Sequence, residues 1–154
     1  MTRVSKIFVH EHPTQYIVSV RSTMNFMVEY EKVSIQTHEQ IMHYLKELDI
    51  LPADGPIVCF HNTDLEALDV EIGFPIPHSI EDKDSIKCHV IKQRKMVTTI
   101  DYGPYEKQDP TLMELMEWIS KNGYQSMGPI YYQYLNEDNR PNEDYLTKMM
   151  IPIT

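Results

Sequence analysis

The chain has 154 residues, of which 42% are hydrophobic and 24% charged, and its formal net charge is −9. These values are typical of one globular domain and exclude a wholly disordered chain. The acidic balance opposes binding to nucleic acid and to anionic membranes, because both depend on clustered lysine and arginine.

No segment approaches the roughly 18–20 apolar residues of a membrane span, and residues 1–10 lack the apolar run of a secretion signal. The only cysteines, Cys59 and Cys88, show neither CxxC spacing nor a disulfide-rich pattern. We therefore expect a cytoplasmic protein.

The first half of the chain predicts a strand, a helix and two further strands. A strand over Tyr16–Arg21 precedes a capping box at Thr37–Gln40. The helix that follows carries its apolar stripe on Ile41, Tyr44, Leu45 and Leu48 and ends before Pro52. Strands over Pro56–His61 and Val70–Ile76 complete this half.

The second half predicts the same order. A strand over Cys88–Ile100 leads to a helix capped by Asp109, with Pro110 at its first position. Asn122-Gly123 ends that helix, since glycine accepts the left-handed conformation. Its apolar face comprises Leu112, Leu115, Met116 and Ile119, and the last two strands are Pro129–Leu135 and Leu146–Ile153.

The two halves also match in detail, which indicates a duplication. Gly55-Pro56-Ile57 recurs as Gly128-Pro129-Ile130, and Glu71–Ile76 corresponds to Lys148–Ile153 at nearly the same offset. We expect an α+β fold from a duplicated βαββ repeat, with an antiparallel sheet, two helices on one face and a cleft between the repeats. A single domain would cover 1–154, with repeats at about 14–80 and 88–154.

Strand alternation places Glu71 and Lys148 at equivalent positions, both away from the expected core. They are either two solvated charges or an ion pair that lines the cleft. Tyrosines gather in the second half and, like Trp118, fit either a pocket or an ordinary core. The predicted ligand-binding residues are Glu71, Tyr105, Trp118, Tyr132, Tyr134, Lys148 and Met150.

The histidines do not form a recognised metal motif. His10 and His12 make an HxH, His38 and His43 are off the i,i+4 ligand spacing, and HExxH is absent. Neither a GxSxG elbow, a P-loop nor a cysteine–histidine motif occurs. We therefore expect no metal and no cofactor, and the sequence identifies no catalytic residue.

Several short segments together carry a family resemblance, densest in the second half. They are Tyr102–Glu106, Glu117–Ile119, Asn122–Tyr124, Gly128-Pro129, Tyr134–Asn136, Tyr145–Thr147 and Ile151–Ile153. In order and spacing they resemble the GyrI-like small-molecule-binding domain, which is also the effector-binding part of AraC-type and MerR-type multidrug regulators. The resemblance spans roughly residues 14–154.

The resemblance implies a cleft that takes up amphipathic, often cationic, molecules. Family members commonly place an acidic residue in the last strand against the ligand's positive charge, and the matching position here is Lys148. This departure argues against cationic ligands unless Glu71 offsets it. It also weakens a hydrolase reading, because relatives that hydrolyse electrophiles use that acid. Residues 1–13 are too few for the regulators' helix-turn-helix, so a stand-alone form is expected.

The expected function is a stand-alone cytosolic module that senses or sequesters a small amphipathic or aromatic molecule. The first alternative is a hydrolase of a toxic electrophile, with Glu71 or a tyrosine as the polar catalyst. The second is an acidic protein-binding inhibitor, similar to gyrase-inhibitory relatives, with a protein partner. Direct binding to nucleic acid or membrane is not expected.

Overall fold

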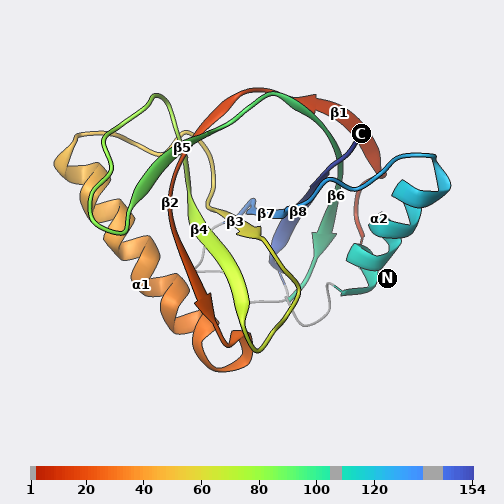
Figure 1. The fold of residues 1–154 in the computed structure, drawn as a ribbon, viewed down its shortest axis with the longest axis horizontal. Coiled ribbons are helices and arrows are strands. Elements are labelled where there is room, and N and C mark those ends of the chain that lie inside the picture. Colours follow the sequence, from red (N-terminus) through yellow and green to blue (C-terminus); the bar gives the residue numbers. More distant parts are fainter. Residues whose placement is uncertain (1–2, 105–108, 137–143) are drawn as a thin grey trace. The chain divides into compact units, whose positions relative to one another are not determined.

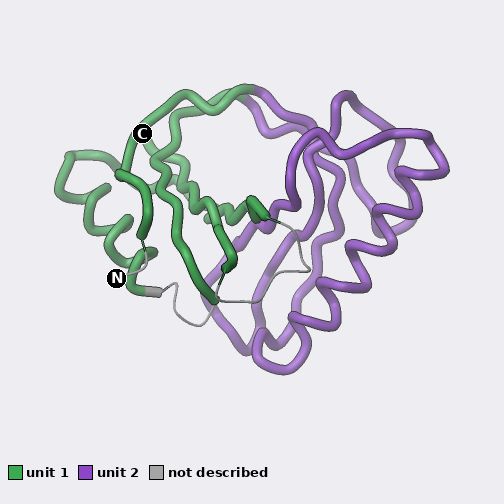
Figure 2. Tube along the Cα trace, turned by 180° about the vertical axis from the view of Figure 1, so that it is seen from behind, with its two compact units in different colours: residues 1–13, 93–154 green, residues 14–92 purple. Residues whose placement is uncertain are grey.

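The computed structural model describes residues 3–104, 109–136 and 144–154. The chain forms two compact units, unit 1 from residues 1–13 and 93–154 and unit 2 from residues 14–92 (Figure 2). Neither helix in the described ranges has the length and apolarity needed to cross a membrane.

Unit 2 contains strands β2 (Gln15–Met24), β3 (Ile57–Phe60), β4 (Leu68–Ile76) and β5 (Lys87–Ile91) and helix α1 (Phe26–Glu47) (Figure 1). The strands pair antiparallel in the order β3-β4-β2-β5. Helix α1 packs against β2 and β4. The core beneath it comprises Val18, Ile41, Tyr44, Leu45, Phe74, Ile76 and Ile86.

Unit 1 contains strands β1 (Phe8–His12), β6 (Arg94–Tyr102), β7 (Ile130–Tyr134) and β8 (Leu146–Pro152) and helix α2 (Asp109–Lys121). Its strands pair antiparallel in the order β1-β6-β8-β7. Helix α2 packs against β6, and Leu115 and Ile119 are its buried apolar residues. Thr111 fixes its first turn by donating to Oδ1 of Asp101 on β6 (2.6 Å).

Both units are built from the same βαββ order, β2-α1-β3-β4 and β6-α2-β7-β8. The strand before each repeat completes the other unit: β1 pairs with β6, and β5 pairs with β2. Reading from that added strand, the order is β1-β6-β8-β7 in one unit and β5-β2-β4-β3 in the other. The predicted α+β fold with a duplicated βαββ repeat and antiparallel pairing is confirmed.

The predicted single strand over Cys88–Ile100 is wrong. It is two strands, β5 and β6, separated by Lys92 and Gln93. The first pairs with β2 and the second with β1 and β8, so the chain passes from one unit to the other at this point. Local composition did not reveal the change of partner.

The predicted start of the first helix at Thr37 is also wrong, because α1 begins at Phe26. The Asn25 side chain caps it by accepting from the Val28 amide (3.3 Å), and Glu29 accepts from the Asn25 amide (3.0 Å). Thr37 lies inside the helix and is buried. The first turns of α1 were not predicted, because Met27 and Val28 are each 79% exposed and are not part of an apolar stripe.

The predicted apolar faces are partly correct. Ile41, Leu45, Leu115 and Ile119 are buried. Leu48 follows the last turn of α1 as its C-cap and is 42% exposed, Met116 is 45% exposed, and Leu112 is half-buried. The predicted end of α2 is confirmed: the helix ends at Lys121 and Gly123 takes a φ of 77°.

Candidate functional site

The sheet of unit 2 has a polar face opposite α1. Its apolar face, with Val18 and Phe74, packs on the helix. Cross-strand partners share a face, and Arg21, Glu71 and Cys59 form one row across β2, β4 and β3. Glu71 lies one residue out of phase with Ile72 and Phe74, so its side chain is on the face away from α1.

Glu71 is the centre of a hydrogen-bonded cluster on this face. Ser19 Oγ donates to Glu71 Oε2 (2.5 Å), and His61 Nε2 donates to Oε1 (2.9 Å). His89 Nε2 makes a short hydrogen bond to Oε2. An ionised carboxylate only accepts, so both imidazoles present an N–H to it. The Glu71 side chain is 11% exposed, compared with 21% for His61 and 42% for His89.

The cluster keeps Glu71 ionised. Burial by itself would raise the pKa of the Glu71 carboxyl, but hydrogen bonds from His89, Ser19 and His61 outweigh it and lower this pKa to about 2. The hydrogen bond to Glu71 raises the pKa of His89 against the effect of its own burial. The carboxylate therefore carries its charge at neutral pH with three donors already in place.

The sequence predicts Glu71 as a site residue but carries no motif that points to Ser19, His61 or His89. The alternation of β3 puts Cys59 and His61 on one face. Their position beside Glu71 depends on the β3–β4 register, which pairs Cys59 with Glu71. His89 comes from β5, which was assigned to a continuous strand of the other repeat.

Unit 1 has a corresponding set of positions. Arg21 pairs with Glu71, and Ile100 pairs with Lys148. Ser19 lies two residues before Arg21 in unit 2, and Thr98 lies two residues before Ile100 in unit 1. The predicted equivalence of Glu71 and Lys148 therefore follows from the strand register.

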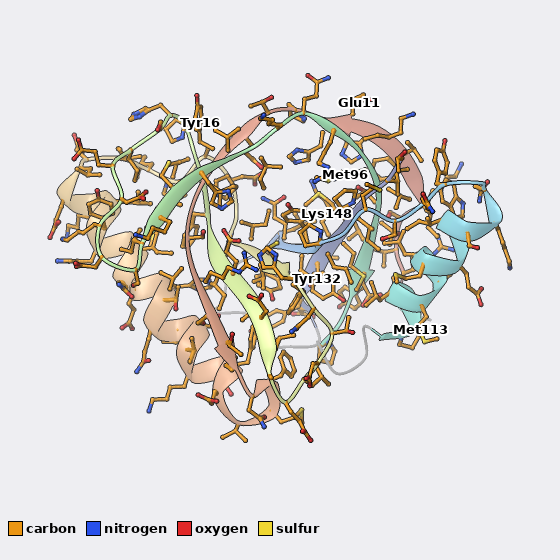
Figure 3. All side chains as sticks on the ribbon, viewed as in Figure 1. Glu11, Tyr16, Met96, Met113, Tyr132 and Lys148 are labelled. Atoms are coloured by element: carbon orange, nitrogen blue, oxygen red, sulfur yellow. The ribbon has the colours of Figure 1, made fainter. Side chains whose placement is uncertain are left out.

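The neighbouring histidines correspond as well. His89 pairs with Ile17, which lies two residues before Ser19. His10 pairs with Met96, which lies two residues before Thr98 (Met96 and Lys148 are labelled in Figure 3). Thr98 Oγ1 lies 3.4 Å from His10 Nδ1, the separation found between Ser19 Oγ and His89 Nε2. Burial, followed by the charges of His12 and Lys148, lowers the pKa of His10. Both units therefore have a hydroxyl residue and a histidine at matching positions, but the residue between them is the anion Glu71 in unit 2 and the cation Lys148 in unit 1.

The register of unit 1 divides the remaining predicted residues between two faces. Tyr132 pairs with Met149 and Tyr134 with Thr147, whereas Lys148 and Met150 have the opposite phase on β8. Thr147 also pairs with Asp101, the partner of α2, so Tyr132 and Tyr134 lie on the α2 face. The two tyrosines therefore lie on the opposite face of the sheet from Lys148 and Met150, and their role in ligand binding stays a prediction.

The β7 residues that do share the face of Lys148 and Met150 are Tyr131 and Gln133, which pair with Met150 and Lys148. Tyr105 lies outside the described residues. The ion pair of Glu71 with Lys148, and the cleft expected between the repeats, stay predictions.

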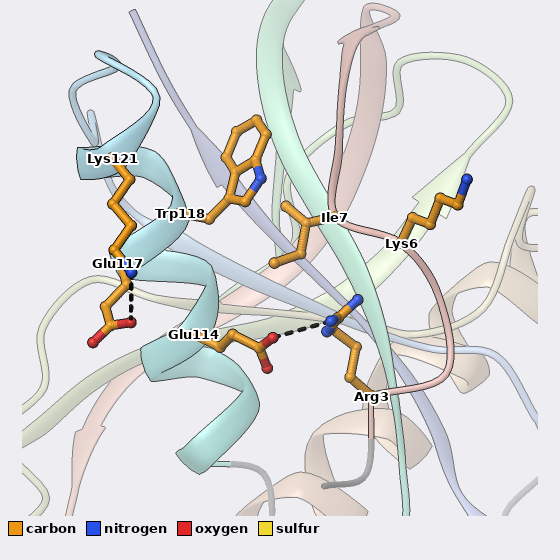
Figure 4. Close-up of a pocket in the computed structure, with 7 residues that line it drawn as sticks. All are labelled: Arg3, Lys6, Ile7, Glu114, Glu117, Trp118 and Lys121. Atoms are coloured by element: carbon orange, nitrogen blue, oxygen red, sulfur yellow. Dashed lines mark hydrogen bonds and ion pairs between the residues drawn. The ribbon is translucent and has the colours of Figure 1, made fainter.

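Trp118 lies on α2 and lines a groove of unit 1 (Figure 4). Arg3 bonds to Glu114 at one end of this groove (3.0 Å), and the Trp118 ring stacks on Tyr124 with centroids 6.0 Å apart. The groove is lined by Arg3, Lys6, Ile7, Glu114, Glu117, Trp118 and Lys121. Trp118 is therefore on the helix side of its unit rather than with Lys148 and Met150.

A family model described as the GyrI-like small molecule binding domain matches residues 6–154. Among curated proteins, none matches this chain. Of the solved structures, the C-terminal domain of EcmrR is 19% identical with a TM-score of 0.84 over 97% of both chains. In the structure of an EcmrR–DNA complex, this chain matches 57% of the EcmrR chain, so it spans little more than half of that protein.

Two further structures share the fold. A hydrolase from Listeria innocua is 14% identical, with a TM-score of 0.72 over 97% of this chain and 92% of its own. SAV2435, in a structure with bound tetraphenylphosphonium, is 13% identical, with a TM-score of 0.63 over 97% of this chain and 94% of its own. At these identities the likeness shows the fold alone.

Proposed function

This chain belongs to the GyrI-like small-molecule-binding domain family, and on that premise we propose that it senses or sequesters a small amphipathic or aromatic molecule. The observation that carries the proposal is the family match over residues 6–154. The tetraphenylphosphonium bound by SAV2435 supports the aromatic character of the ligand, because it is a small aromatic cation held by the same fold; the charge preference proposed for this chain rests on Glu71 instead.

We propose that the ligand contacts the sheet face that carries Glu71. This face offers a carboxylate held by three donors, and the imidazole of His89 beside it is 42% exposed and therefore open to solvent. Apolar Ile17 and Ile57 are in phase with Ser19 and Cys59 and lie beneath the cluster. Ligand sites commonly combine an apolar lining with a few oriented polar groups. The three donors already on Glu71 satisfy its charge. Neutral or zwitterionic ligands are therefore favoured over strongly cationic ones.

Binding is favoured over hydrolysis by the state of Glu71. A general base works best with a pKa near the operating pH, and the pKa of Glu71 is about 2. Cys59 Sγ and Glu71 Oε1 both approach the same nitrogen, Nε2 of His61. A nucleophile–base–acid triad uses the two different nitrogens of the histidine. The cluster therefore lacks the geometry of a thiol hydrolase.

A cytosolic location is part of the proposal. Cys59 and Cys88, both in the described part of the chain, are thiols rather than a disulfide. Thiols persist where glutathione and thioredoxin keep the compartment reducing.

The test is a thermal-shift and equilibrium-dialysis screen of the full chain against neutral aromatic, zwitterionic and cationic amphiphiles. We expect neutral or zwitterionic compounds to raise the melting temperature and Glu71→Gln to weaken their binding. Met113→Gln, an exposed position on α2, is the matched control. Absence of saturable binding across the panel would refute the proposal, and turnover of an electrophilic panel member would favour the hydrolase.

A further inference from the structure

Three side chains of unit 2 turn metal-binding atoms toward one another. Cys59 Sγ, His61 Nε2 and a carboxylate oxygen of Glu71 all lie within 4.8 Å of one another. Sγ is 3.5 Å from Nε2, and Nε2 is 2.9 Å from Oε1. Sulfur, imidazole nitrogen and carboxylate oxygen are the three donor types that proteins use for zinc.

The backbone holds these three donors in place. Cys59 and His61 are two residues apart and therefore on the same face. Cys59 is paired with Glu71 in the β3–β4 ladder, and the His61 amide continues it by donating to the carbonyl of Asp69 (2.9 Å). A C-x-H segment beside a glutamate on the next strand thus forms one compact donor set.

The donors converge on a point rather than forming a chain. Because Sγ and Oε1 both approach His61 Nε2, that nitrogen cannot serve both in a proton relay. A metal ion at the centre of the three atoms would bind all of them together once the Cys59 thiol has lost its proton and the proton on His61 Nε2 has passed to Nδ1 or to solvent. Bonds of 2.0–2.3 Å in a tetrahedral site imply donor separations of roughly 3.3–3.8 Å. The Sγ–Nε2 separation of 3.5 Å lies in this range, the Nε2–Oε1 separation of 2.9 Å is shorter, and all three atoms lie within 4.8 Å of one another. Metal binding therefore requires the side chains to shift by about an ångström or less.

We propose that Cys59, His61 and Glu71 bind a zinc ion, with the fourth coordination position open to water or to a donor atom of a bound molecule. Zinc suits the mixed set because it accepts thiolate, imidazole and carboxylate together, whereas magnesium and calcium prefer oxygen alone. The site is sheltered: Cys59 is 7% exposed and the Glu71 side chain 11%.

Ser19 and His89 act as positioning residues for this site. Both bond to Oε2 of Glu71, which leaves Oε1 facing His61 and Cys59. Ligating carboxylates are usually oriented by such outer hydrogen bonds, and loss of one typically weakens metal binding about 10–100-fold. Substitution of Ser19 or His89 should therefore weaken zinc binding less than substitution of a proposed ligand.

The experiment is a titration of the metal-free full chain with zinc by calorimetry and with cobalt(II) by absorption. We expect one ion per chain and a cobalt spectrum with tetrahedral d–d bands and a thiolate charge-transfer band. Cys59→Ser should abolish the charge-transfer band, His61→Gln should abolish tight binding, and Ser19→Ala should weaken zinc binding by about 10–100-fold.

Two controls test the assignment. His12→Gln removes the HxH of unit 1, and Cys88→Ser removes the other thiol, so both should leave binding unchanged. Cys88→Ser also keeps the proposed ligands intact, so its cobalt spectrum tests Cys59 even if Cys59→Ser fails to fold. Absence of stoichiometric binding, a charge-transfer band lost with Cys88, or tight binding lost with His12 would each overturn the proposal.

Discussion

Glu71 couples the stability of unit 2 to pH. Its pKa is lowered from the ordinary 4.5 to about 2. Its contribution to stability is therefore complete above pH 4.5 and is lost as the pH falls toward 2. The pKa of His89 is raised from its ordinary 6.5, so its contribution is present below pH 6.5 and is lost as the pH rises through the folded-state value. The cluster should be most stabilising between about pH 4.5 and 6.5.

The measurement is urea unfolding of wild type and Glu71→Gln in the presence of a metal chelator. The difference in unfolding free energy should be largest near pH 5.5, reach up to about 3 kcal/mol, and shrink toward pH 2–3. The other carboxylates titrate in both proteins, so their contribution cancels in the difference between wild type and Glu71→Gln. A difference that stays constant from pH 5.5 to pH 2.5 would contradict the role given to Glu71.

Lys148 places a positive charge on the sheet of unit 1. It holds the position in unit 1 that Glu71 holds in unit 2. If residue 148 contacts the ligand, Lys148→Glu should raise the affinity for an organic cation such as a rhodamine several-fold, because it replaces a repulsive charge by an attractive one. Dye titration by fluorescence anisotropy measures this. Met113→Glu adds the same carboxylate at a 68%-exposed site, and an equal gain there would show only a general charge effect.

At the scale of the element, Gly73 fixes how β2 and β4 pair beside the cluster. Gly73 pairs with Ser19, and a Cβ at this position would collide with the carbonyl oxygen of Val18. The strands approach so closely here that any side chain must push them apart. This approach also holds Ser19 near Glu71.

Gly73→Ala should therefore destabilise the chain by about 1–3 kcal/mol, the usual cost of overpacking. It should also weaken the Ser19–Glu71 hydrogen bond, which raises the pKa of Glu71 toward its ordinary value. Thermal unfolding measures the first effect, and carboxyl NMR titration measures the second. Thr23→Ala, at an exposed position of β2, serves as the control. Wild-type stability of Gly73→Ala would show that the strands separate without cost.

The helices show what local sequence signals predict well. Asn122-Gly123 marks the end of α2 because a left-handed glycine is a local requirement. The start of α1 at Phe26, after the N-cap Asn25, was not predicted, because its first turns leave apolar Met27 and Val28 exposed. A stripe of apolar residues predicts only the buried part of a helix.

At the scale of the whole molecule, the charge of −9 predicts weak attraction to nucleic acid. In a gel-shift assay near physiological salt, the chain by itself should leave a duplex DNA fragment unshifted at micromolar protein. Lowering the salt should not restore binding, since counterion release needs clustered lysine and arginine. A salt-dependent shift would reveal a basic surface that outweighs the net charge.

The sequence by itself determined the α+β class and the βαββ repeat, because hydrophobic periodicity, glycine and proline positions, and duplicated segments are all local signals. It also determined that Glu71 and Lys148 occupy equivalent positions. Tertiary structure decided which partners surround them. Ser19, Cys59, His61 and His89 come from three other strands or their ends. Only Cys59 and His61 are related by spacing, two residues apart, and no motif links them to Ser19, Glu71 or His89. Strand register brought them to Glu71, and register depends on pairing between distant segments, which the order of residues in each segment does not express.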